Sequence, residues 1–122
     1  MRTPYYEYYM SLMNHNELLN GKLLRLFPDK KSRESVSKLL MNYGLESYEP
    51  EPSRVRLAVL KLSGTDISEI EIMTKRSKED YRDILAWAEY PRQSQNPTMP
   101  NGSKKRKLIE ADKIEYELWL NT

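Results

Sequence analysis

The chain has 122 residues, of which 39% are hydrophobic and 31% charged, with 20 Lys and Arg against 18 Asp and Glu and no cysteine. A chain of this length forms one domain, and its composition excludes collagen-like and low-complexity classes. No stretch approaches the roughly 18 apolar residues that a membrane helix needs, and without cysteine there are no disulfides. The formal net charge of +2 is too small to indicate nucleic-acid binding.

The N-terminal segment carries a stripe at helical spacing. One helix could span it, but Asn14-x-x-Glu17 is typical of a capping box and Gly21 weakens a continuous rod, so we favour two helices. The stripe could join two copies of the chain as a homodimer through residues 5–26, although packing within its own domain is the favoured interpretation. Its members lie alternately four and three residues apart: Tyr5, Tyr9, Leu12, Asn16, Leu19, Leu23 and Leu26.

Two further helices are predicted before residue 65. The first covers about residues 32–43 and ends at Gly44, in the place of a left-handed C-terminal cap; residues 45–53 then form a connection. The second, residues 54–62 (RVRLAVLKL), is the densest apolar stretch of the chain. A helix that is apolar on both sides belongs in the middle of a bundle, so we expect 54–62 to be the central helix.

The segment from 66 to 90 begins with the capping signature Asp66-x-x-Glu69 and stops before Pro91. Its apolar residues keep helical spacing throughout. Whether it forms one helix or two, broken near Arg76-Ser77, is left open by the sequence.

The last part of the chain is predicted as a loop over 91–103 and a helix over 104–120 that packs back onto the bundle, because its apolar residues lie on two faces. The whole chain, residues 1–122, is therefore predicted to be one all-α domain, a compact bundle of five or six helices. The expected core is Leu19, Leu23, Val36, Leu40, Val55, Ala58, Val59, Leu62, Ile70, Tyr81, Ile84, Leu85 and Ala88.

Catalytic and metal chemistry find little support in the sequence. His15 is the only histidine, and no zinc ligand set or glycine-rich phosphate loop is present. Asp80 and Asp83 lie on neighbouring turns and could hold a divalent cation in a small metal-dependent enzyme. The favoured interpretation is that they form boundary ion pairs, so we expect no catalytic residue, metal or other cofactor.

A helix-turn-helix is the alternative suggested by residues 68–85, where Ser77 takes the place of the turn serine. Lys75 replaces the turn glycine, and Glu79, Asp80 and Asp83 would face phosphates with negative charge. The basic run 104–107 is best explained as a solvated lead-in to the last helix. These features argue against a nucleic-acid partner.

Residues 54–64 (RVRLAVLKLSG) and 80–92 (DYRDILAWAEYPR), with a tail at 116–120 (YELWL), resemble a group of short bacterial proteins of unassigned function. The resemblance covers about residues 14–120 and implies a compact helical protein in a bacterial cytoplasm. It also implies that residues 1–13 are an N-terminal extension. It brings no known activity, cofactor or catalytic residue.

The function expected from the sequence is a non-catalytic cytoplasmic protein-binding module, of accessory or immunity type, whose partner is another protein. The chain has more Tyr and Trp than a domain of this size must bury, and both residue types are favoured anchors of interfaces. The candidate partner-binding residues are Asp80, Asp83, Trp87, Tyr90, Tyr5 and Tyr9.

Overall fold

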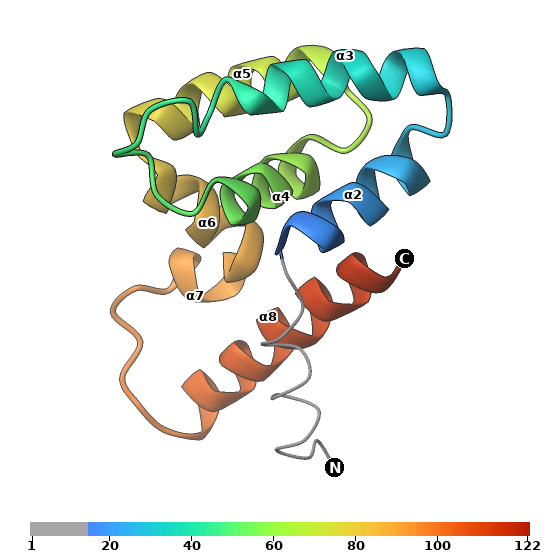
Figure 1. Ribbon diagram of the computed structural model, residues 1–122. Coiled ribbons are helices and arrows are strands. Elements are labelled where there is room, and N and C mark those ends of the chain that lie inside the picture. The colour runs from blue at the N-terminus through green and yellow to red at the C-terminus, as the bar shows by residue number, and fades with distance from the viewer. Residues whose placement is uncertain (1–14) are drawn as a thin grey trace.

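The computed structural model describes residues 15–122, and within that range the chain forms seven α-helices and no strand (Figure 1). The predicted all-α bundle is confirmed. Tyr5 and Tyr9, and most of the N-terminal stripe before residue 15, lie outside the described residues. The helices are α2 (His15–Leu26), α3 (Lys30–Met41), α4 (Pro52–Ser63), α5 (Ile67–Glu79), α6 (Tyr81–Glu89), α7 (Pro91–Gln95) and α8 (Ser103–Asn121).

Helix α4 is the central helix, as predicted. It packs against α2, α5 and α6, and in Figure 1 it lies below α3 and α5. Leu57 and Leu60 face away from Val55 and Val59, yet all four side chains are almost completely buried. A helix buried on both sides explains why this stretch is the most apolar of the chain.

The predicted core is confirmed except at Leu62 and Tyr81, which are half-buried and pack against its edge. Both lie at helix ends, Leu62 in the last turn of α4 and Tyr81 in the first turn of α6. The buried apolar residues absent from the expected set are Phe27, Tyr43, Leu57, Leu60 and Leu120.

Local capping sets the starts of α3 and α5. Asp29 accepts a hydrogen bond from the Ser32 amide at 2.9 Å, so α3 begins two residues earlier than predicted. Asp66 caps α5 through the Glu69 amide at 3.2 Å, as its capping signature predicts. Gly44 has φ +101°, the left-handed conformation that its position after α3 requires.

The segment from 66 to 90 forms two helices, and the break lies at Asp80 rather than near Arg76-Ser77. Ser77 stays helical because its hydroxyl donates to the Met73 carbonyl at 2.9 Å. Asp80 adopts an extended conformation, and its carboxylate accepts the Arg82 amide at 3.0 Å, which starts α6. The turn that a helix-turn-helix would place around Lys75–Ser77 is therefore occupied by continuous helix.

The prediction of an uninterrupted loop over 91–103 is wrong, because Pro91–Gln95 forms the short helix α7. The carboxylate of Asp112, far along the chain, accepts the backbone amides of Arg92 and Gln93, each at 3.1 Å. A carboxylate that satisfies the first free amides of a helix stabilises it there. Local composition carries no sign of this distant cap.

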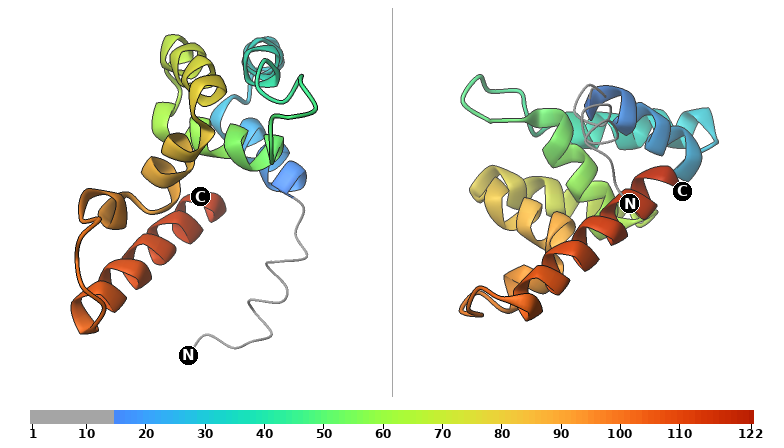
Figure 2. Two further views of the ribbon diagram at one scale, coloured as in Figure 1. Left: turned by 90° about the vertical axis from the view of Figure 1, so that its left-hand side faces the viewer. Right: turned by 90° about the horizontal axis from the view of Figure 1, so that it is seen from below.

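Helix α8 packs back onto the rest of the protein, as predicted, lying along α7 and α6 with its C-terminal end beside α2 (Figures 1 and 2). Lys22 donates to the Trp119 carbonyl at 2.7 Å and Arg25 to the Leu120 carbonyl at 2.7 Å. Cations at the last carbonyls of a helix complement its dipole. No helix among residues 15–122 is both long and apolar enough to cross a membrane.

Candidate functional site

One side of α6 presents three of the residues singled out from the sequence. Asp83, Trp87 and Tyr90 follow at intervals of four and three, which places them on one side of the helix and just beyond its end. Trp87 is 37% exposed and Tyr90 38%. The guanidinium of Arg76, on the neighbouring α5, lies 5.3 Å from the centre of the Trp87 ring and holds it by a cation–π contact.

Asp80 does not belong to this group. It caps α6 at the opposite end from Tyr90 and lies beside another hollow, next to Tyr48 and Glu49. One of its carboxylate oxygens accepts the Arg82 amide, so it serves the backbone. Within residues 15–122 no group of three or more His, Asp or Glu side chains is placed to hold a metal ion. In this part of the chain, Asp80 and Asp83 are thus not joined by a third side chain that could bind a metal ion with them.

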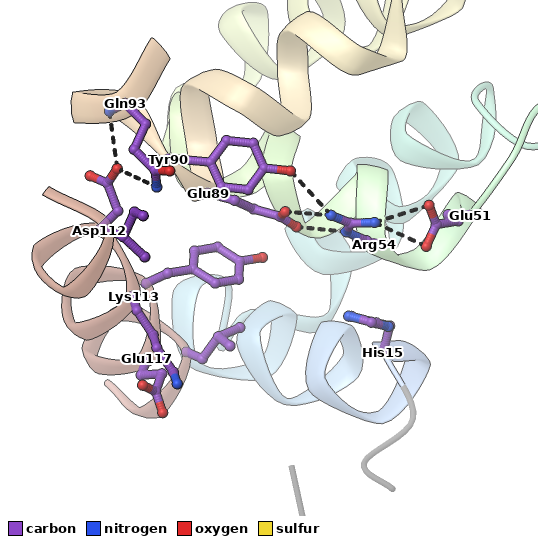
Figure 3. Close-up of a pocket in the computed structure, with 12 residues that line it drawn as sticks. His15, Glu51, Arg54, Glu89, Tyr90, Gln93, Asp112, Lys113 and Glu117 are labelled. Atoms are coloured by element: carbon purple, nitrogen blue, oxygen red, sulfur yellow. Dashed lines mark hydrogen bonds and ion pairs between the residues drawn. The ribbon is translucent and has the colours of Figure 1, made fainter. Parts of the chain in front are cut away.

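Tyr90 marks the edge of a cleft of about 650 Å³ between α8 on one side and α2, α4 and α6 on the other (Figure 3). Volumes of this size are typical of sites that hold a small molecule or a side chain. Figure 3 shows Asp112, Lys113 and Glu117 on the α8 side and Arg54 on the opposite side. In the α6 stripe formed by Asp83, Trp87 and Tyr90, Tyr90 is the residue that lines the cleft.

The cleft contains an ion-pair cluster in which one guanidinium serves two carboxylates. Arg54 donates from Nε and Nη2 to the two Glu89 oxygens, at 2.8 and 2.7 Å. Its Nη1 donates to both Glu51 oxygens, at 3.1 and 3.0 Å, and the Tyr90 hydroxyl lies 3.5 Å from Nη2. The hydrogen bonds to Glu89 hold the pKa of Arg54 above its usual range. Two carboxylates therefore share one guanidinium in this cluster.

Glu51 occupies an unusual backbone position beside this cluster. Its φ is +48°, the one positive φ of a non-glycine residue within the described part of the chain. Such a conformation costs about 1–3 kcal/mol in a residue with a side chain and needs support from its surroundings. Pro52 follows as the first residue of α4, and the Glu51 carboxylate pairs with Arg54 one turn later. The ion pair thus helps to hold the start of α4.

The Tyr116 hydroxyl is buried at the cleft without a hydrogen-bond partner among residues 15–122. Burial, together with the negative charge of Glu89, raises the pKa of this phenol well above its usual value, while Arg54 lowers it. The group is therefore a neutral hydroxyl. Most buried polar atoms in proteins have a partner, so this oxygen remains able to accept a hydrogen bond from a bound group.

A second ion-pair network fixes the α8 wall of the cleft. Asp112 is 1% exposed and also accepts side-chain hydrogen bonds from Arg92 and Gln93, at 3.0 and 3.1 Å. Burial opposes its ionisation, but the four hydrogen bonds outweigh that effect and lower its pKa. Glu115 joins Arg92 to Lys61 of α4, and the Lys61 hydrogen bond lowers its pKa. These contacts hold α8 at its distance from α4.

Sequence reasoning found the α6 stripe and missed the cleft. Arg54 and Glu89 are 35 residues apart, and Tyr116 is further still, so no local spacing links them. The one local signal was the pairing of Glu51 with Arg54 at three residues' distance. The site depends on the way in which α4, α6 and α8 meet.

Comparison with known proteins adds no relative to this description. No family model, curated protein or solved structure matches the chain. Any function must therefore be argued from the residues and the geometry of the α6 stripe and the cleft.

Proposed function

We propose that this protein is a non-catalytic protein-binding module, of accessory or immunity type, and that its partner contacts Asp83, Trp87 and Tyr90 together with the cleft beside them. The observation that carries the proposal is the exposure of Trp87 and Tyr90, at 37% and 38%, within one helical turn of each other. Trp, Tyr and Arg are the residue types that contribute most to binding energy at interfaces.

The way in which Trp87 is held supports the same conclusion. Its contact with Arg76 restrains an exposed ring, so less side-chain entropy is lost when a partner binds. The carboxylate of Asp83 forms no hydrogen bond or ion pair with the described residues that would need to be broken first. The surface is thus arranged in advance for contact.

Three acidic groups of the cleft have a structural task, which supports binding rather than catalysis. Glu51 and Glu89 neutralise Arg54, and Asp112 caps α7. A general acid or base needs a pKa near the working pH, whereas the pKa of Asp112 is lowered. We further propose a cytoplasmic location, with which the cysteine-free sequence agrees.

The proposal is tested by capture of the partner from nuclease-treated host lysate with tagged protein. We expect one near-stoichiometric protein on the wild-type chain and a marked loss with Trp87→Ala or Asp83→Ala. Tyr48→Ala is the matched control, because it removes an aromatic ring that is 79% exposed in the α3–α4 connection. Equal capture of the partner by wild type and by Trp87→Ala would refute the proposed surface. Loss of all captured material on nuclease treatment would instead support a nucleic-acid partner.

A further inference from the structure

The cleft has features that select the chemistry of what enters it. Two carboxylates, Glu51 and Glu89, share the single guanidinium of Arg54. Four acidic side chains line the cleft, those of Glu51, Glu89, Asp112 and Glu117, against the two cationic side chains of Arg54 and Lys113, so the acidic groups outnumber the cations. Asp112 adds no free charge, since Arg92 pairs with it. A cation brought into the cleft would meet this excess charge in a partly desolvated place, where Coulomb attraction is stronger than in water.

The remaining lining suits a long aliphatic stem that carries a charge. The rings of Tyr90 and Tyr116 and the apolar side chains of Ile109 and Leu120 line the same cleft. Lysine and arginine bury their methylene groups along such surfaces, and their charged heads bind favourably to aromatic faces. The buried Tyr116 oxygen can accept an N–H from an ammonium or guanidinium group.

We propose that the cleft receives a cationic side chain, lysine or arginine, presented by the partner protein. The proposal rests on the protein-binding function argued above and names what the partner contributes. The side chain passes Tyr90 at the rim, packs its methylenes against Leu120 and Ile109, and directs its charge to Glu51 and Glu89. An acidic side chain would instead be repelled by the same two carboxylates.

The probe is a capped pentapeptide, Gly-Gly-Lys-Gly-Gly, compared with its Arg and Glu counterparts and titrated into the ¹⁵N-labelled full chain. We expect the Lys or Arg peptide to shift amide signals of cleft residues, and the Glu peptide to shift none. Glu51→Gln should weaken binding about threefold to tenfold, because it removes one charge–charge contact at a partly exposed position. Glu71→Gln, which removes the same charge from an exposed position of α5, is the control.

Tyr116→Phe separates a binding role from a structural one. If the Tyr116 hydroxyl accepts a hydrogen bond from the bound cation, Tyr116→Phe should bind the Lys or Arg peptide about threefold more weakly. The free energy of unfolding of this variant should stay equal or rise, because an unpaired buried group is lost. Two results would overturn the proposal: equal binding of the Glu peptide, or unchanged affinity in both Glu51→Gln and Tyr116→Phe. If no peptide binds but Trp87→Ala still abolishes partner capture, the protein-binding function stands and the cationic occupant is refuted.

Discussion

Replacing Asp112 by alanine should detach α8 from α7 and lower the stability of the whole domain. The carboxylate is 1% exposed and accepts four hydrogen bonds, two from the Arg92 and Gln93 amides and two from their side chains. Alanine would leave both amides without their acceptor at the start of α7. Among residues 15–122, Asp112 is the side-chain acceptor of both amides.

The size of the effect follows from these contacts. Each amide left unpaired in a buried place costs about 1–3 kcal/mol, and the half-exposed Arg92 adds little because it keeps Glu115. Since α7 lies near the surface and can relax toward water, we expect a loss of about 2–4 kcal/mol in the free energy of unfolding. For a domain of this size that corresponds to a decrease of roughly 8–15 °C in Tm.

The assay is urea unfolding followed by circular dichroism, with Glu110→Ala as the matched control. Glu110 is an exposed residue of α8, two positions before Asp112, so its removal should change stability by less than about 0.5 kcal/mol. Because the folded-state pKa of Asp112 is lowered, its contribution is present above the pKa of an unfolded aspartate and is lost as the pH falls. The reasoning is refuted if Asp112→Ala unfolds within 0.5 kcal/mol of Glu110→Ala at neutral pH.

Three further predictions concern the core, the turns and alkaline pH. Val59→Ala should lower the free energy of unfolding by about 1–3 kcal/mol. Leu62→Ala should lower it by less than a Leu→Ala change in the core interior, because Leu62 is half-buried. Equal stability of Val59→Ala and wild type in urea unfolding would contradict the central position of α4. Gly44→Ala should be more destabilising than Gly64→Ala, since both have positive φ but only at Gly44 would a Cβ lie 2.6 Å from Arg56 and Pro52; the Tm difference between the two variants measures this. Burial raises the pKa of Tyr43 to about 12, above its value in the unfolded chain. The contribution of Tyr43 to stability is therefore complete below pH 10 and is lost as the pH rises toward 12. Over this interval the urea midpoint of Tyr43→Phe should fall by less than that of the wild type.

Sequence reasoning succeeded where the determining contacts are local. Apolar residues on all sides of 54–62 identified the central helix, and Asp66 capped the next helix as its spacing predicts. The break at Asp80 is not predicted from the sequence, because Asp80 also fits a charged surface position, whereas in the structure its carboxylate accepts the amide two residues later. Ser77, which pointed to an earlier break, bonds back within its own helix.

The parts that could not be predicted depend on residues brought together by the fold. Helix α7 forms under the carboxylate of Asp112, about 20 residues later in the chain, and its own loop-like sequence gives no sign of this. The cleft joins Arg54 to Glu89 across two helices and adds Tyr116 from a third. The α6 stripe could be read from spacing alone, whereas its neighbouring cleft required the packing of α8.

The most direct test of the account is hydrogen–deuterium exchange of the full chain, alone and in complex with the captured partner. We predict that the partner slows exchange in residues 81–90 and in the part of α8 that borders the cleft, around Lys113 to Leu120, and leaves the α3–α4 connection unchanged. Slowed exchange confined to α3 or to the exposed side of α5, with α6 and α8 unaffected, would contradict the proposal that Trp87, Tyr90 and the adjoining cleft form the binding surface.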